Sequence, residues 1–168
     1  VVATEDSSVF TVKNLKQFSA IILLNTTGDI FNEEGQKALQ SYIRSGGGLA
    51  GIHAASDGEY NWPWYNQMIG AYFESHPKIQ KASIKVVENH PSTSFLENPW
   101  VRKDEWYNFK SFNLSVTVLL ELDESSYEGG KMNGKHPIAW YHSFEGGKIF
   151  YTGLGHTSES YTEPAFLK

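Results

Sequence analysis

The sequence of 168 residues contains no cysteine, and this absence excludes several kinds of site. Without thiols there are no disulfides, no cysteine-based zinc sites and no thiolate nucleophile. The chain carries a net charge of −5 and has no run of basic residues. This argues against nucleic-acid binding, which draws on clustered cations. No apolar stretch approaches the length that spans a membrane.

What remains is the composition of an ordinary globular protein, with 40% hydrophobic and 20% charged residues. The aromatic share of 14% suits a packed core and also a sugar-binding cleft. The length predicts one domain over residues 1–168. The sequence leaves open whether this domain has been trimmed at both ends. A leader peptide would precede residue 1, so the compartment stays open. Homo-oligomers and fusion to other domains stay open as well.

The first third of the chain has the pattern of a βαβ unit. Residues 19–25 form a nearly continuous apolar run, which is typical of a strand buried on both faces and favours a parallel sheet. Asn32 has the character of an N-cap, and an apolar stripe at helical spacing follows it. The glycines at 46–48 end this helix, and the next strand runs to His53. A right-handed crossover is expected.

The rest of the chain predicts one further helix and several strands. The helix is expected over Trp64–Tyr72. Strands are expected at 83–88 and 116–122, and residues 127–134 read as a turn or exposed loop. Two more strands, at 137–144 and 148–156, are joined by Glu-Gly-Gly and predict an antiparallel hairpin.

Polar residues that follow strands carry most of the functional information, because ligands of open α/β sheets bind at the carboxyl ends of the strands. Three places stand out. His53 is followed by Asp57, His156 by Glu159, and Asp104 and Glu105 lie in the segment before residue 116. Two histidines and a carboxylate can bind a divalent metal such as zinc, or act as general acid and base.

Each candidate also has a structural interpretation. His53 fits a buried histidine whose hydrogen bonds are satisfied by its neighbours. Asp104 and Glu105 are adjacent, so in a strand only one would face the cleft. His76, His90 and His136 each precede a proline, which places them in loops or at strand starts with solvent exposure as the default. No histidine pair has a metal-ligand spacing such as HExxH.

Six stretches of the sequence, taken in order, form a recognisable set. They are GGGLAGIHAASD, WPWYNQMIGAYFESHP, HPSTSFL, KDEWYNF, HPIAWYHSFEGGKIFYTGLGH and SESY. Together they resemble the ThuA-like (trehalose utilisation) family, and the resemblance covers nearly the whole chain. It implies an α/β fold, a flavodoxin-like three-layer sandwich with a mostly parallel sheet, similar to the class I glutamine amidotransferases.

The relation to the amidotransferases gives His53 a specific meaning. In those enzymes the turn after the corresponding strand carries a catalytic cysteine, and a later strand end carries a histidine followed closely by a glutamate. Here His53 stands at the cysteine position. His156 and Glu159 resemble the later pair, with a spacing one residue longer. Without a thiol, the thioester chemistry of glutamine hydrolysis is not available, so no glutaminase activity is expected.

Three functions are compatible with these residues. The first is an enzyme acting on a carbohydrate, a disaccharide or a keto sugar, with His53 and His156 as base, acid or metal ligands. Glu105 or Asp57 would be the carboxylate partner. The second is a non-catalytic sugar-binding or accessory module. The third is a metal-binding structural domain of a larger secreted protein. Further candidates for substrate contact are Trp62, Trp64, Trp106, Tyr107, Asp104 and Glu159.

The environment of His53 can also be predicted. Ala54, Ala55 and Ser56 are small, so the imidazole should face a cavity. A helix that begins at Ala54 would place its positive end beneath the ring and keep His53 neutral near pH 7. A neutral imidazole can accept a proton or bind a metal, and an imidazolium can do neither.

Overall fold

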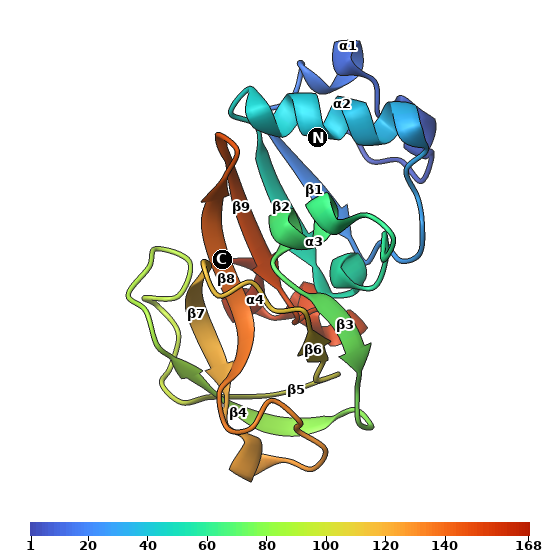
Figure 1. Ribbon diagram of the computed structural model, residues 1–168. Helices are drawn as coiled ribbons and strands as arrows, with labels where there is room; N and C mark the ends of the chain where they lie inside the picture. The colour runs from blue at the N-terminus through green and yellow to red at the C-terminus, as the bar shows by residue number, and fades with distance from the viewer.

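The computed structural model describes all 168 residues, which form a curled sheet of seven strands and a separate sheet of two (Figure 1). The strands are β1 (Ala20–Leu24), β2 (Gly48–Ile52), β3 (Tyr72–Ser75), β4 (Gln80–Val86), β5 (Trp100–Asp104), β6 (Asn108–Lys110), β7 (Thr117–Leu122), β8 (His136–Phe144) and β9 (Gly147–Thr152). The large sheet has the order β1-β2-β9-β8-β7-β4-β5, and β3 pairs with β6.

Helices account for a smaller part of the chain, and none is long and apolar enough to cross a membrane. The α-helices are α1 (Val12–Leu15), α2 (Glu33–Arg44), α3 (Pro63–Ile69) and α4 (Pro164–Leu167). Four short 3₁₀ turns accompany them: η1 (Ser7–Val9), η2 (His53–Ser56), η3 (Glu124–Ser126) and η4 (Ser158–Thr162).

The prediction of a mostly parallel sheet is wrong. Strand β2 is parallel to β1 and to β9, but the pairings of β9 with β8, β8 with β7, β7 with β4 and β4 with β5 are antiparallel. A parallel neighbour needs a long crossover such as α2, whereas β8 and β9 are joined by the predicted tight hairpin. The α/β class is correct, and the sheet is mixed.

Helix α2 forms for the reasons that its sequence indicates. The Asn32 side chain accepts a hydrogen bond of 2.8 Å from the backbone N–H of Gly35, and Glu33 and Glu34 lie in the first turn. The acidic residues favour the positive end of the helix. The stripe of Ala38, Leu39, Tyr42 and Ile43 is buried. The N-cap and the apolar face predicted from the sequence are therefore confirmed.

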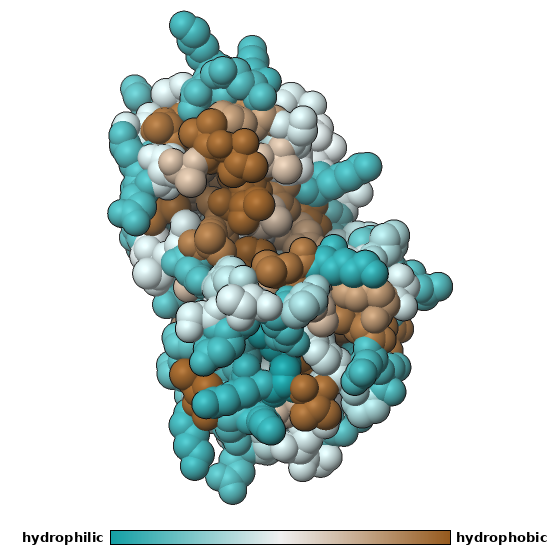
Figure 2. Space-filling view, turned by 180° about the vertical axis from the view of Figure 1, so that it is seen from behind, coloured by the Kyte–Doolittle hydropathy of each residue, from teal (hydrophilic) through white to brown (hydrophobic).

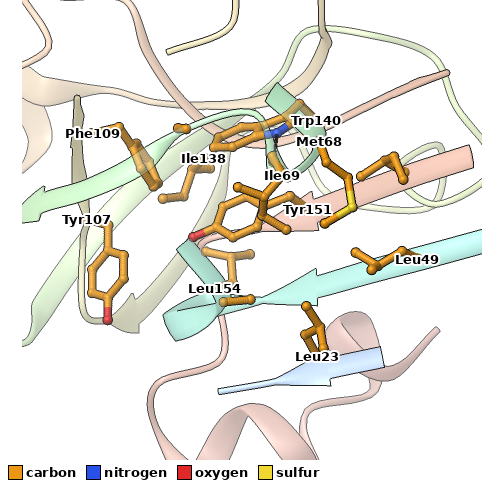
Figure 3. Packing of buried hydrophobic residues seen from close by; sticks show 14 of the residues in the cluster. Leu23, Leu49, Met68, Ile69, Tyr107, Phe109, Ile138, Trp140, Tyr151 and Leu154 are labelled. Atoms are coloured by element: carbon orange, nitrogen blue, oxygen red, sulfur yellow. Dashed lines mark hydrogen bonds between the residues drawn. The ribbon is translucent and has the colours of Figure 1, made fainter. Parts of the chain in front are cut away.

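Helices α2 and α3 cover one face of the parallel part of the sheet. On this face Tyr151 of β9 stacks on Trp140 of β8, with ring centroids 4.4 Å apart, and Ile69 of α3 packs nearby (Figure 3). A side chain at Gly51 of β2 would collide with Ile69, so glycine permits the close approach of α3 to the sheet. This core fixes the ends of β2 and β9 relative to each other.

The opposite face of the sheet is less covered than a three-layer sandwich requires. Ile22 and Leu24 of β1 remain 64% and 54% exposed. The view from behind shows apolar side chains gathered in its upper part (Figure 2). Helix α4 and the loop around Leu96 flank a groove of about 250 Å³ on this face. Here the structure departs from the expected second helical layer, because α4 is a single turn.

The segment between β2 and β5 also differs from the prediction. The expected helix over Trp64–Tyr72 ends at Ile69, since Gly70 adopts a left-handed conformation (φ 100°) and β3 starts at Tyr72. No α-helix begins at Ala54, where the chain makes only the 3₁₀ turn η2. The sequence did not indicate β3, β5 or β6.

Candidate active site

His53 lies directly after β2, in a backbone conformation that histidine adopts rarely. Its φ is +48°, in the left-handed region. The hydroxyl of Tyr151 donates a hydrogen bond of 2.7 Å to the His53 carbonyl oxygen, and it lies 2.8 Å from the Ser56 hydroxyl. Figure 3 shows Tyr151 with its hydroxyl directed towards this turn. The buried tyrosine thus supports a backbone shape that the local sequence does not favour.

The His53 side chain is buried, with 1% of its surface exposed, and its tautomer follows from its contacts. Nδ1 lies 2.8 Å from the carbonyl oxygen of Gly153, which can only accept, so Nδ1 carries a proton. Burial lowers the pKa of His53 below 6.5, and the carboxylates of Asp104 and Glu105 offset only part of this effect. His53 is therefore neutral near pH 7, with its lone pair on Nε2.

Burial, not a helix terminus, is the cause of this neutrality. The sequence predicts a helix start beneath the ring, but η2 is a single 3₁₀ turn and the nearest α-helix begins at Pro63. An imidazolium loses its hydration when it is buried, so the neutral form is favoured without help from a helix dipole. The predicted protonation state holds for a different physical reason.

Glu105 and His156 complete a compact cluster with His53. The Nε2 atom of His53 lies 3.1 Å from Nδ1 of His156 and 3.3 Å from Oε2 of Glu105. The third side of this triangle, from His156 Nδ1 to Glu105 Oε2, is also 3.3 Å. His53 and Glu105 are buried, whereas the His156 side chain is 40% exposed. Two ring nitrogens and one carboxylate oxygen therefore converge just beneath the surface.

Asp104 does not join this cluster and instead positions the loop that carries His156. It is completely buried, and its carboxylate accepts hydrogen bonds from the backbone N–H groups of Gly155 (2.9 Å) and His156 (3.1 Å). Arg102, also buried, lies 3.1 Å from the same carboxylate. The adjacent acids thus divide in two roles, as strand alternation predicts, with only Glu105 directed to the histidines.

His76 belongs to the site, although the sequence assigned it to an exposed loop by default. Its Nδ1 lies 3.1 Å from Oε1 of Glu105 and 2.9 Å from the carbonyl oxygen of Pro77. Both partners are acceptors, so Nδ1 carries a proton and the lone pair is on Nε2. The side chain is 43% exposed. His76 directly follows β3, so the strand-end rule would have found it had β3 been recognised.

Tyr107 forms a wall of the cluster. Its ring centroid lies 4.1 Å from that of His53 and 6.2 Å from that of His76. The ring is itself buried, and burial together with the nearby carboxylate of Glu105 raises the pKa of its hydroxyl far above 10.0. Tyr107 is therefore a neutral aromatic surface against which both imidazoles rest.

The tryptophans named as candidates for substrate contact are not part of this cluster. Trp106 is fully buried, and its indole N–H donates to the carbonyl oxygen of Gln80. Trp64 donates a hydrogen bond of 2.9 Å to Glu145, in the turn between β8 and β9. That turn is at the end of β9 opposite to His156. Trp62 stacks on Trp64 and on Tyr65.

Asp57 and Glu159 lie near the cluster in sequence but make other contacts. The carboxylate of Asp57 accepts hydrogen bonds from the hydroxyls of Thr27 (3.0 Å) and Tyr60 (2.6 Å). Glu159 is exposed in η4, and its carboxylate accepts a hydrogen bond from the Ser158 hydroxyl. The predicted site residues that the structure brings together are therefore His53, Glu105 and His156, with Tyr107 beside them.

Comparison with known families shows where the chain belongs. The ThuA family, described as "Trehalose utilisation", matches residues 1–168. The chain is a member of the ThuA family. This agrees with the resemblance carried by the sequence motifs around His53 and His156. No match is found among curated proteins.

One solved structure supports the same assignment, and two more distant ones share the fold. A ThuA-like protein from Bacteroides uniformis ATCC 8492 is 30% identical, with a TM-score of 0.81 over 96% of this chain and 70% of its own. A ThuA-like protein from Parabacteroides merdae ATCC 43184 is 19% identical, with a TM-score of 0.74 over 94% of this chain and 68% of its own. A β-galactosidase from Rahnella sp. R3 shares the fold over 84% of this chain and 21% of its own, at 13% identity and a TM-score of 0.58.

Proposed function

We propose that this ThuA-family chain is an enzyme of carbohydrate utilisation that acts on a disaccharide or a keto sugar. The observation that carries the proposal is the convergence of His53, Glu105 and His156 at the ends of β2, β5 and β9. Surface loops rarely bring neutral imidazoles together, and a carboxylate beside them allows proton transfer or metal binding. The description of the family, "Trehalose utilisation", supports the substrate class.

The reactive feature of the site is the lone pair on Nε2 of His53. It would accept a proton from the sugar or, with a metal bound, serve as one of its ligands, and such a metal would polarise a sugar carbonyl. Access comes from the exposed side of His156, while burial of His53 and Glu105 keeps the reacting groups away from bulk water. His76 offers a second exposed lone pair on Nε2, within reach of a substrate that contacts Glu105.

Turnover assays on disaccharides and their keto derivatives test the proposal. His53→Asn is the decisive variant, because asparagine tolerates a positive φ and its amide can still donate towards Gly153. We expect at least about a 100-fold loss of turnover with little change in melting temperature. His90→Asn is the matched control, since His90 packs against Tyr141 and does not touch the cluster.

Two results would overturn this function. The first is binding of the sugars without any turnover, which would favour an accessory module. The second is a His53→Asn variant that melts much earlier but keeps full activity when folded. We also expect no glutamate release from glutamine above the His53→Asn background, because the chain has no cysteine to form a thioester.

A further inference from the structure

We infer that His53, Glu105 and His156 form a binding site for one divalent metal ion, with zinc as the best match. The inference starts from the triangle of donor atoms, whose sides are 3.1, 3.3 and 3.3 Å. Zinc binds histidine nitrogen and carboxylate oxygen at about 2.0–2.1 Å in tetrahedral geometry, which separates neighbouring ligand atoms by about 3.3–3.4 Å. The three atoms thus already have the spacing of one face of a zinc tetrahedron.

Hydrogen bonding alone does not account for this arrangement. Nδ1 of His53 donates to Gly153, so in the neutral ring its Nε2 is an acceptor, and Oε2 of the ionised Glu105 is an acceptor as well. One proton on Nδ1 of His156 can satisfy only one of these two atoms well. The remaining contact sets two lone pairs against each other inside the protein, which is unfavourable. A cation among the three atoms would attract all three lone pairs and so offset the repulsion between them.

The surroundings of the triangle hold each ligand in the orientation that a metal requires. Metal-binding histidines commonly donate their other ring N–H to a carbonyl or a carboxylate, as His53 does to Gly153. The Nδ1–H of His76 donates to the carbonyl oxygen of Pro77, and Nδ1 also lies 3.1 Å from Oε1 of Glu105, so Oε2 is the oxygen left for the metal. Asp104 fixes the backbone of His156. His76 is therefore a positioning residue for Glu105.

The ligand set indicates a reactive site and not a structural one. Structural zinc sites are closed by four protein ligands, whereas two histidines and one glutamate leave a fourth position for water or substrate. The outer side of the triangle is also the accessible one, since the side chains of His156 and His76 are 40% and 43% exposed. A metal in this position would polarise a substrate oxygen or lower the pKa of a bound water.

The proposed metal site consists of the same side chains as the proposed active site. Only the role of the metal in turnover rests on the proposed function. Binding itself is measured without substrate. The chain is freed of metal with a chelator and titrated with Zn²⁺ by calorimetry, and with Co²⁺ by visible absorption. We expect one equivalent of Zn²⁺ and the intense visible bands of four-coordinate Co²⁺.

Substitutions inside and outside the cluster distinguish a loss of metal binding from a loss of folding. His156→Asn and Glu105→Gln should weaken Zn²⁺ binding at least about 100-fold, and His76→Asn about 10- to 100-fold, in line with the usual effect of an outer-shell partner. His90→Asn and Glu159→Gln are the matched controls and should bind as the unaltered chain does. Without metal, four of these five variants should have similar melting curves. Glu105→Gln is the exception, because Glu105 is buried.

Two outcomes would overturn the metal site: no stoichiometric binding by the folded chain, or unchanged affinity in folded His156→Asn. Turnover that persists in excess chelator would remove the metal from the reaction while leaving the proposed function in place. Conversely, tight one-to-one binding without turnover on any sugar would support the metal site and contradict the proposed function.

Discussion

Asp104 determines where His156 lies, although it touches no ligand atom. Its carboxylate accepts from two successive backbone N–H groups, Gly155 and His156, and pairs with Arg102 at 3.1 Å. Gly155 has φ +106°, which side chains rarely adopt. The loop after β9 therefore depends on one buried acid and one glycine, and both act through the backbone.

Replacing Asp104 with asparagine should destabilise the protein by about 3 kcal/mol, because it removes the fully buried charge partner of the buried Arg102. Urea unfolding measures this change. Glu163→Gln is the matched control, since Glu163 contacts the same Arg102 from a more exposed position, at 3.3 Å, and should cost less than about 1 kcal/mol. Equal effects of the two variants would contradict a special role for Asp104.

At the scale of single elements, α2 shows that local signals are readable. Asn32, the acidic first turn and the buried stripe all agree with the observed helix. We expect Asn32→Ala to lower the free energy of unfolding by about 1 kcal/mol, through loss of the hydrogen bond to Gly35. Asn32→Ser should restore most of it, and Ala at the exposed Asn89 should change nothing. Denaturant curves of the three variants check this.

The loop before β8 is organised by Glu124 of η3. Its carboxylate accepts from the backbone N–H groups of Met132 (2.7 Å) and Gly134 (2.8 Å) and lies 3.0 Å from Nδ1 of the buried His136. Partial burial raises the pKa of Glu124, but these hydrogen bonds outweigh it and leave the pKa below 4.5. The carboxylate thus ties this loop to the core.

The lowered pKa of Glu124 determines how the unfolding free energy changes with pH. A depressed pKa in the folded state means that the unfolded chain binds the proton more readily, so this stabilisation is present above pH 4.5 and is lost as the pH falls through the folded pKa. In Glu124→Gln the unfolding free energy should fall less steeply between pH 5 and pH 3. Glu128→Gln, an exposed neighbour, should keep the slope of the unaltered chain, and an equally steep Glu124→Gln profile would contradict the assignment.

At the scale of the whole molecule, the sequence predicted the local units better than their assembly. The βαβ unit and the β8–β9 hairpin were both indicated, yet the mostly parallel sheet was not found. The apolar run at 19–25 suggested a strand buried on both faces, but Ile22 and Leu24 are exposed. A strand's composition shows that its side chains are apolar and does not show which face is covered.

The residues of the candidate site could be predicted from the sequence wherever the ends of the strands could be predicted. His53 and His156 follow strands that are clear from the sequence, and Glu105 was named with them. His76 was missed because β3 is only four residues long and has no distinct periodicity. The left-handed φ of His53 and the role of Asp104 depend on contacts with Tyr151 and with the loop after β9, distant in sequence.

The exposed apolar side chains of β1 should promote dye binding and self-association of this chain in solution. We expect the double variant Ile22→Lys, Leu24→Lys to bind less of a hydrophobic dye and to self-associate less in sedimentation. Its unfolding free energy should change by no more than about 0.5 kcal/mol, because both side chains already face solvent. A loss of several kcal/mol would mean that this face is packed in solution.

The cluster draws its members from positions 53, 76, 105 and 156, and His53 and His156 are 103 residues apart. During synthesis the ribosome must deliver the chain through His156 before all four side chains can meet, and β9 must insert between β2 and β8. A nascent chain that has only reached β7 holds His53, His76 and Glu105 without their last partner. The site is thus completed only after β9 has been made, and any ligand that needs both His53 and His156 is captured only by a nascent chain that extends past residue 156.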